Sequence, residues 1–360
     1  MPANFRFRHV VIDADPPGSH HDITLLHDLT GNGLRDIIIG GKQGPPNLFW
    51  YENPGGDGHW QRHEMAEADD LEAGGVVFDV NGDGRPDIVA GQQWREGKLL
   101  WWFECPEDPR EPWPVRVIED RFAKYHDQAI GDVDGDGEPE LVFLSQFGGV
   151  LGYYDIPDDP TVEPWPVERF HMIDDEIDDA EGLAIVDIDG DGVIEIIAGT
   201  RIYAPEDLSA DRWSRHEFAA GYTQTRVAVA DFAGSGSLQI VLVEGESDEG
   251  RMAIFDPPDW EPRVLRSDLF HPHSLEIADF DGDGRPDIFV AEMGLGRNPH
   301  EPQMFVFRNT GGGQFDEAVI ASGIPTHEAK VADMTGDGRP DIVGKPYDPE
   351  RHIDLWINET

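Results

Sequence analysis

Short apolar runs alternate with acidic, glycine-containing loops along the whole chain. In the unit ADFDGDGRPDIFVAE (278–292), one apolar run leads into such a loop and a second leaves it. A third run, rich in aromatic residues, follows in most units, as in LLWWFECP (99–106). A fourth carries a charged residue before an apolar pair, as in WPVRVIE (113–119). Short β-branched and aromatic runs bounded by Gly, Pro and Asp predict four β-strands in each unit.

The acidic loop recurs at intervals of about 50 residues. Its first aspartate falls at seven positions: Asp28, Asp79, Asp132, Asp187, Asp231, Asp279 and Asp333. Four strands per repeat at this period are typical of a β-propeller blade. The sequence therefore predicts an all-β protein, a seven-bladed β-propeller of four-stranded blades.

The two ends of the chain complement each other. The seventh unit stops after its third run, at Thr360, and the missing fourth run matches NFRFRHVVI (4–12). An N-terminal strand that completes the last blade would close the ring and remove a long exposed sheet edge. We therefore expect one domain, residues 1–360, and a monomer, because a closed ring needs no second chain.

Acidic residues at positions 1, 3, 5 and 9 of each loop predict calcium sites, because Ca²⁺ binds six to eight oxygens in irregular geometry. Six loops carry most of the set, and the blade 5 loop (Asp231, Ala233, Ser235, Gln239) is predicted to be empty. The alternative is that these acids are polar turn residues. The predicted ligands are Asp28, Asn32 and Asp36; Asp79, Asn81, Asp83 and Asp87; Asp132, Asp134, Asp136 and Glu140; Asp187, Asp189, Asp191 and Glu195; Asp279, Asp281, Asp283 and Asp287; and Asp333, Asp337 and Asp341.

The net charge of the chain limits the classes of partner that it can bind. The chain has 73 acidic and 27 basic residues, a formal charge of −46, which argues against nucleic acid as a partner because phosphate binding needs a basic face. With 39% apolar residues and ten tryptophans it is not a disordered acidic chain. Few lysines and an excess of acid indicate an acidic coat of the kind that proteins of salt-loving organisms use, where salt screens self-repulsion.

No stretch is apolar for long enough to predict a transmembrane helix. Cys105 is the single cysteine, so no intrachain disulfide is expected. The N-terminus lacks an apolar signal core and a twin-arginine pair. Two localisations fit: the cytoplasm of a salt-loving organism, or secretion with the leader removed.

The face opposite the acidic loops is where strand 1 begins and strand 2 ends. Each blade places a different polar group there, including several histidines and the cations Lys42, Arg201 and Lys345, which we expect to form a basic funnel that holds an anion. The candidate catalytic residues are His21, His126, Arg201, Tyr203, His273 and His327. The candidate substrate-binding residues are Lys42, Gln92, Glu181, Glu244, Glu292 and Lys345.

Imidazoles beside cations suit the removal of a proton next to a carboxylate, with the cations stabilising the enolate-like transition state. This chemistry is β-elimination on a uronic acid. Alternatives remain open. Glu181, Glu244 and Glu292 could pair for glycoside hydrolysis, and His126, His273 and His327 with Glu181 could hold Zn²⁺ or another transition metal. The structural interpretation is that these residues hydrogen-bond one another and hold the blade ends together.

A non-enzymatic module that binds glycan or protein is the competing class. Trp50, Trp94, Trp101 and Trp102 could stack on sugars, although their strand patterns favour a place in the core between blades.

The repeated D-x-D-G-D-G-x-x-D resembles the FG-GAP/VCBS repeat propellers, a group that includes the integrin α-subunit head, over nearly the whole chain. The segments 271–300 and 326–348 are similar to the rhamnose–glucuronate lyases and, more distantly, to ulvan lyases. This resemblance implies an acidic carbohydrate as the substrate and β-elimination by His, Tyr and Arg on one propeller face. The match is by residue type and blade position and does not identify the base.

Overall fold

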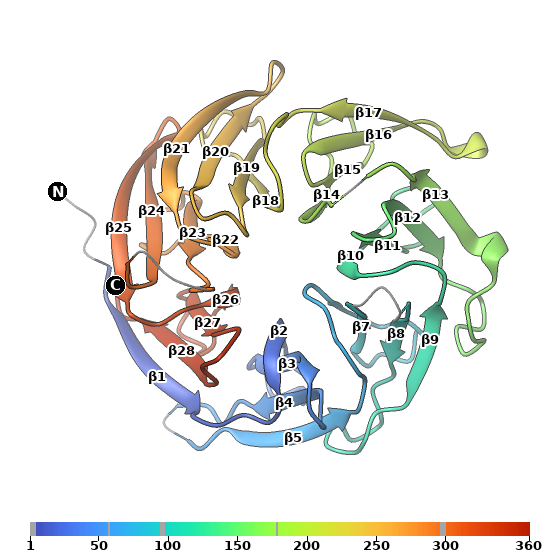
Figure 1. Cartoon of the computed structure of the whole chain (residues 1–360), viewed down its shortest axis with the longest axis horizontal. Coiled ribbons are helices and arrows are strands. Elements are labelled where there is room, and N and C mark those ends of the chain that lie inside the picture. The colour runs from blue at the N-terminus through green and yellow to red at the C-terminus, as the bar shows by residue number, and fades with distance from the viewer. Residues whose placement is uncertain (1–4, 57, 94–97, 178, 296–299) are drawn as a thin grey trace.

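Seven four-stranded antiparallel sheets surround a central axis (Figure 1). The computed structural model describes residues 5–56, 58–93, 98–177, 179–295 and 300–360. In these residues the helical segments are two short 3-10 turns, Val167–Arg169 and Leu208–Ala210, and everything else that is regular is β-strand. The predicted all-β, seven-bladed propeller is confirmed.

Six blades are continuous in sequence, and in each the first strand lies nearest the axis (Figure 1). Blades 1 to 3 consist of β2 (Ser19–His27), β3 (Asp36–Gln43), β4 (Leu48–Glu52) and β5 (Gln61–Ala66); β6 (Val76–Phe78), β7 (Asp87–Gly91), β8 (Leu100–Phe103) and β9 (Val115–Glu119); and β10 (Tyr125–Gly131), β11 (Glu140–Ser145), β12 (Val150–Asp155) and β13 (Phe170–Asp174). Blades 4 to 6 consist of β14 (Leu183–Val186), β15 (Glu195–Ala198), β16 (Arg201–Asp207) and β17 (Arg212–Glu217); β18 (Thr225–Ala230), β19 (Gln239–Glu244), β20 (Gly250–Asp256) and β21 (Glu261–Leu269); and β22 (Ser274–Ala278), β23 (Asp287–Ala291), β24 (Gln303–Gly311) and β25 (Gln314–Ser322).

Blade 7 joins the two ends of the chain. It consists of β26 (His327–Ala332), β27 (Asp341–Lys345), β28 (Ile353–Asn358) and, as its outermost strand, β1 (Phe7–Asp13). β1 pairs antiparallel with β28, with Phe7 opposite Asn358. The predicted closure by the N-terminal strand is confirmed.

Hydrophobic side chains from neighbouring blades pack into shared clusters. Leu25 of blade 1 lies in one cluster with Trp101 of blade 2, and Tyr51 of blade 1 in another with Leu355 of blade 7. Burying one large side chain contributes roughly 1.5–3 kcal/mol, so these contacts hold the ring together. The expectation that tryptophans form the core holds for Trp50, Trp101 and Trp102, which are buried.

Trp94 lies outside the described residues.

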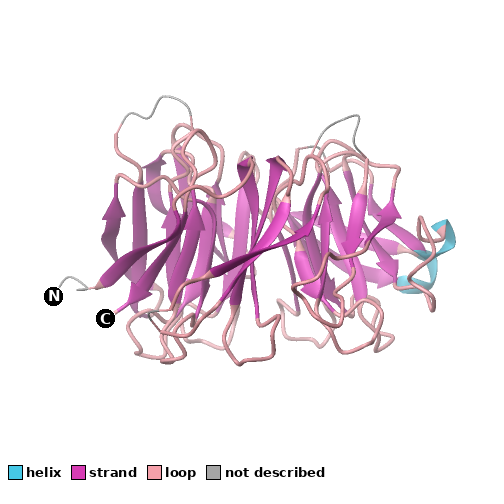
Figure 2. Cartoon of the chain, turned by 90° about the horizontal axis from the view of Figure 1, so that it is seen from below, coloured by secondary structure: helices cyan, strands magenta, loops and turns pink. Residues whose placement is uncertain are grey.

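The two faces of the ring carry different connections (Figure 2). All acidic loops join strand 1 to strand 2 and gather on one face, called here the loop face. The strand 2–3 connections and the links between blades gather on the other, called here the axial face because the start of each first strand reaches the axis there. Among the described residues, no helix has the length and apolar character needed to span a membrane.

Candidate functional site

Each acidic loop closes on its first aspartate. Asp279 accepts hydrogen bonds from the backbone N–H groups of Asp283 (3.0 Å) and Gly284 (2.8 Å). In blade 5, where the acid set is incomplete, Asp231 accepts the same pair of bonds from Ser235 (2.9 Å) and Gly236 (2.6 Å). The backbone therefore holds this loop shape even where the sequence lacks a full calcium set.

The ninth loop position ties the loop to the third strand of its own blade. Asp287 accepts from the N–H of Phe280 (3.0 Å) and from that of Asn309 (2.7 Å), which lies in β24. The Asn309 amide in turn donates to the carbonyl of Phe232 in blade 5 (2.8 Å). An acid of the loop motif thus helps to position an amide that links two blades.

Carboxylate oxygens converge in the loops of blades 3 and 4. Oxygens of Asp132, Asp134 and Asp136 lie within 4.8 Å of one another, as do those of Asp187, Asp189 and Glu195. Oxygen atoms at this separation fit the ligand set that Ca²⁺ prefers.

In blades 2, 6 and 7 the fifth-position aspartate pairs instead with an arginine two residues later, as Asp283 does with Arg285. Calcium in the loops stays a prediction.

On the axial face the structure brings several predicted residues into one buried cluster at the axis. We define the axial cluster as His126, Glu181, Arg226, His273, His327 and Glu328. The Nε2 atoms of His126 and His273 lie 3.7 Å and 3.9 Å from Glu181 Oε2. The rings of His273 and His327 stack with centroids 4.3 Å apart.

Arg226 is the centre of this cluster, and the sequence analysis missed it. Its guanidinium lies 2.9 Å from Glu181 and 2.9 Å from Glu328, and its Nη2 lies 2.7 Å from His273 Nε2. Counting six residues back from each loop aspartate finds His126, Glu181, His273 and His327.

Counting five residues back finds Asp127, Arg226 and Glu328. Including this position in the count would have listed Arg226 as a candidate.

Burial sets the charge states of the imidazoles. It holds the pKa of His327 well below its usual value, with the charge of His273 acting in the same sense. Burial likewise lowers the pKa of His273, helped by Arg226. For Glu181, burial opposes ionisation, but His126 and Arg226 outweigh it and bring the pKa to about 2. Burial thus favours the neutral forms of His273 and His327 beside an ionised Glu181. For His126, burial acts to lower the pKa, but the charges of Glu181 and Asp127 outweigh it and raise the pKa.

The three cations predicted to form a funnel are each already engaged. Lys42 is ion-paired with Asp22 and lies 3.7 Å from Glu72. Lys345 is fully buried and donates to the carbonyl of His327 (3.1 Å), and burial lowers its pKa to about 7. Arg201 lies 3.3 Å from Asp174. The charges of Lys42 and Arg201 are locally compensated, which leaves Lys345 as an amine that gains or loses its proton near neutral pH.

The other predicted residues support their own blades. Arg201 and Tyr203 both contact Asp174, at the end of the outer strand β13, with Tyr203 donating at 2.7 Å. His21 contacts the carbonyl of Pro17 (2.8 Å), and burial lowers the pKa of its imidazole to about 4.

Three strand 2 ends hold nearby loops. Gln92 donates to the carbonyl of Asp69 (3.1 Å), Glu244 accepts from Arg251 (2.7 Å) and Glu292 from the N–H of Phe270 (2.9 Å). The side-chain contacts given above for these six described residues all lie outside the axial cluster. The residues are His21, Gln92, Arg201, Tyr203, Glu244 and Glu292.

Tyr347 connects the axial region with solvent. Its ring lies 5.0 Å from that of His327, its hydroxyl accepts from Lys42 (3.1 Å), and the side chain is half-buried. Burial and the charge of Asp22 raise the pKa of this phenol to about 12, so it keeps its proton. Phe147, on the strand 2–3 connection of blade 3, is 42% exposed with the Lys124 ammonium 5.0 Å from its ring. Both aromatic rings are on the axial face.

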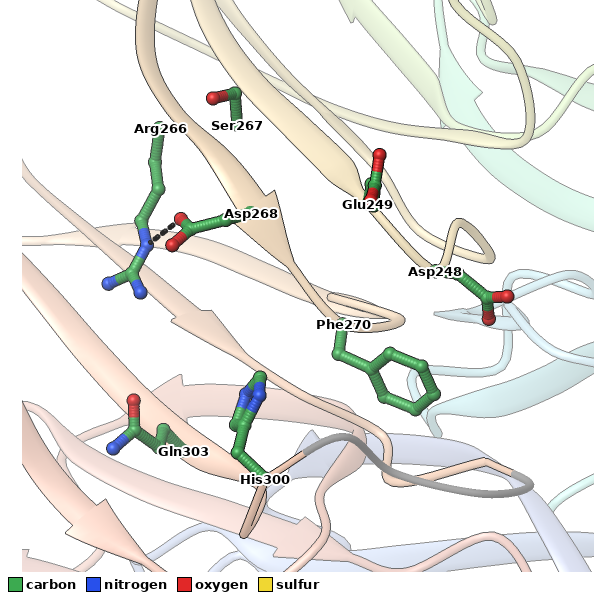
Figure 3. Close-up of a pocket in the computed structure, with 8 residues that line it drawn as sticks. All are labelled: Asp248, Glu249, Arg266, Ser267, Asp268, Phe270, His300 and Gln303. Atoms are coloured by element: carbon green, nitrogen blue, oxygen red, sulfur yellow. Dashed lines mark hydrogen bonds and ion pairs between the residues drawn. The ribbon is translucent and has the colours of Figure 1, made fainter.

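A pocket of about 750 Å³ lies on the same face between blades 5 and 6 (Figure 3). Arg266, Phe270 and His300 are among its lining residues. Arg266 already pairs with Asp268 (2.7 Å) and Glu317 (2.5 Å). The pocket therefore offers polar contacts but no uncompensated cation among these residues.

Comparisons with known proteins agree with this architecture. Residues 28–90 and 279–344 match the FG-GAP-like repeat. These two segments cover the loop regions of blades 1, 2, 6 and 7. The chain is therefore a seven-bladed β-propeller that carries FG-GAP-like repeats. No curated protein matches its sequence.

Two solved structures share the fold. One describes specific recognition of non-reducing terminal N-acetylglucosamine by a lectin of Agrocybe aegerita, with 17% identity over 95% of this chain and 86% of that one, and a TM-score of 0.56. The other is the V. cholerae biofilm matrix protein Bap1, with 11% identity over 97% of this chain and 89% of that one, and a TM-score of 0.50. Identities this low establish the fold alone.

Proposed function

We propose that this protein is a carbohydrate-active propeller that binds a uronate-containing glycan on its axial face and cleaves it by β-elimination, in the manner of the rhamnose–glucuronate lyases. The observation that carries the proposal is the axial cluster itself. The Arg226 guanidinium contacts the imidazoles of His126 and His273 there, and the His327 ring stacks on that of His273. The Lys345 amine, with a pKa of about 7, donates to the His327 carbonyl.

β-Elimination on a uronate has three requirements. A base removes the proton on the carbon next to the carboxylate, the electron pair forms the 4,5 double bond, and the glycosidic oxygen leaves with a proton from an acid. Lys345 and His327 have lowered pKa values, so each is available in its neutral form near pH 7. Tyr347 keeps its proton and suits the acid. Lys42, 3.1 Å from the Tyr347 hydroxyl, would stabilise the charge that develops.

The rim of the axial face supports a sugar as ligand. Tyr347 and Phe147 present ring surface beside Lys42 and Lys124, respectively. Aromatic rings supply large apolar area with a defined geometry, and ammonium groups beside them attract an acidic glycan. In a chain of net charge −46, this face carries two ammonium groups, of which Lys42 is paired with Asp22 and Lys124 lies 4.0 Å from Glu181.

A second candidate is glycan binding without cleavage. It is favoured by the fact that Arg226 already pairs with Glu181 and Glu328, and that the axial imidazoles are buried. The solved lectin with this fold recognises a terminal sugar. Glycoside hydrolysis gains no comparable support, because Glu244 and Glu292 are each held by groups of nearby strands and loops.

The test is to incubate the calcium-loaded protein at high salt with ulvan, gum-arabic-type and pectic polysaccharides and to follow the absorbance of the 4,5-unsaturated uronate. We expect product from at least one, and loss of roughly 10²–10⁴-fold in rate for Tyr347→Phe, because the acid is removed while the ring remains.

Tyr51→Phe, on the outer part of blade 1 with its hydroxyl 2.8 Å from Asp13, is the matched control and should keep the wild-type rate. Binding without any absorbance rise would favour the lectin-like alternative. Absence of both binding and product would refute a carbohydrate function for these glycans.

A further inference from the structure

Three nitrogen and oxygen atoms from three different blades face one point in the axial cluster. They are His126 Nε2 of blade 3, Glu181 Oε2, which precedes blade 4, and His273 Nε2, which precedes blade 6. The carboxylate oxygen is 3.7 Å from one nitrogen and 3.9 Å from the other. The three residues each offer one ligand atom within 4.8 Å of the other two. Ligands of tetrahedral Zn²⁺ at about 2.1 Å are separated by about 3.4 Å. The spacing here is close to that of a metal site.

The outer contacts of these three side chains are those of metal ligands. His126 Nδ1 lies 2.8 Å from Asp127 Oδ2, and His273 Nδ1 lies 3.1 Å from Glu328 Oε1 and 3.0 Å from Arg226 Nη2. A carboxylate on Nδ1 fixes the tautomer that leaves Nε2 with its lone pair, the usual arrangement around metal-bound histidine.

Glu181 follows the same rule. Its Oε1 accepts from the Gln146 amide at 2.6 Å, which leaves Oε2 facing the two nitrogens. Each of the three candidate ligands therefore has a partner that holds its other polar atom. Polar blade ends that only hydrogen-bond one another do not need such an arrangement.

A cation already sits at this point. Arg226 Nη1 is 2.9 Å from Glu181 Oε2, and Arg226 Nη2 is 2.7 Å from His273 Nε2 and 3.5 Å from His126 Nε2. The three atoms thus surround a positive charge. Arg226 has a second carboxylate in Glu328, 2.9 Å from its Nε, so it keeps a partner when it withdraws from Glu181.

We propose that His126, Glu181 and His273 form a binding site for one divalent transition-metal ion of the Zn²⁺ class, and that the ion displaces the Arg226 guanidinium toward Glu328. Two imidazoles and one carboxylate favour Zn²⁺, Co²⁺ or Ni²⁺ over Ca²⁺, which prefers oxygen ligands alone. This site is distinct from the acidic loops, which lie on the opposite face. A bound ion of this class would act as a Lewis acid toward a substrate oxygen. The inference stands independently of β-elimination.

The experiment is a Co²⁺ titration of the calcium-saturated protein, read by visible d–d absorption. We expect one equivalent of Co²⁺ with the intense bands of a four-coordinate nitrogen–oxygen site, and their loss when Zn²⁺ is added. His126→Ala and Glu181→Gln should abolish the bands, whereas His171→Ala, a histidine stacked on Tyr153 in blade 3 outside the cluster, should leave them unchanged.

Two further variants test the contact between Asp127 and His126 and the role of the Arg226 guanidinium. Asp127→Asn keeps every ligand and should weaken Co²⁺ binding about 10–100-fold, because it removes the outer partner of His126. Arg226→Gln should strengthen Co²⁺ binding, because the competing cation is gone.

No saturable visible band in the calcium-loaded protein, or bands that survive Glu181→Gln, would overturn the metal site. Unchanged or weaker binding in a folded Arg226→Gln protein would overturn the displacement. Because the readout is spectroscopic, a failed lyase assay would leave this result intact, and the reverse also holds.

Discussion

Replacing Asn53 by alanine should weaken the ring at the seam between its first and last blades. The Asn53 amide donates to the carbonyl of Met334 in blade 7 (2.9 Å) and to that of Arg35 in its own blade (2.9 Å). The first bond is buried and the second is partly buried. A buried carbonyl left without a donor costs about 1–3 kcal/mol, so the two together predict a loss of about 2–4 kcal/mol in the free energy of unfolding. This is a large share of the 5–15 kcal/mol that is typical of a folded protein.

The assay is urea unfolding at fixed calcium and salt, with the free energies of the variant and the wild type extrapolated to zero denaturant. Blade 2 provides the converse test, because Cys105 occupies the position of Asn53 and its N–H contacts Asp87 (2.7 Å) as that of Asn53 contacts Asp36 (2.8 Å).

Cys105→Asn should add the missing link to blade 1 and gain about 1 kcal/mol. An Asn53→Ala loss below about 0.5 kcal/mol would refute the reasoning, because that is the scatter of neutral surface substitutions.

Two further perturbations probe the loops and the buried lysine. Removing calcium with a chelator should lower the melting temperature. Asp134→Asn should reduce the amount of bound calcium, whereas Ser235→Ala, in the loop predicted to be empty, should not. Unchanged melting and no calcium uptake would contradict the clamp role. Burial lowers the pKa of Lys345 from 10.5 to about 7, so between these values the unfolded chain binds the extra proton, and stability should rise with pH. Relative to Lys345→Met, the wild type should gain about 1.4 kcal/mol per pH unit between about pH 7.5 and about pH 9.5, and parallel pH profiles would argue against a buried amine of lowered pKa.

The fold could be predicted because the same loop motif recurs once in each blade. Gly282 and Gly284 adopt positive φ angles of 72° and 85° beside Asp279, and each copy of this turn marks one strand 1–2 connection. Strand ends were predicted less well. β1 covers Phe7–Asp13 where 4–12 was expected, because its limits are set by pairing with β28.

The axial cluster could be predicted only in part. The count of six residues back from each loop aspartate located His126 and His327, but it left out the residues that directly follow them. The pairing of β10 shifts between Tyr125 and Asp127, and that of β26 shifts between His327 and Lys330. A bulge re-aims consecutive side chains, which explains how Asp127 and Glu328 join the histidines that precede them.

Arg226 could not be inferred as the hub, because its importance comes from Glu181 and Glu328, which lie 45 and 102 residues away. The strand 2 ends were misleading for a related reason. Glu292 directly follows strand β23, whereas Lys345 is the last residue of β27. The backbone N–H groups of Phe270 and Gln303 donate to the Glu292 carboxylate and hold it away from the axis. Local donors of this kind depend on loop conformation, which no repeat pattern encodes.

The central claim is that the chemistry lies on the axial face and that the acidic loops serve as scaffold. It is tested most directly by measuring unsaturated uronate product and melting temperature together for Tyr347→Phe and Asp134→Asn. The account predicts that Tyr347→Phe loses product formation at an unchanged melting temperature. Asp134→Asn should instead melt earlier but keep the wild-type rate per folded molecule. Loss of rate in the folded Asp134→Asn protein, with Tyr347→Phe fully active, would contradict the account.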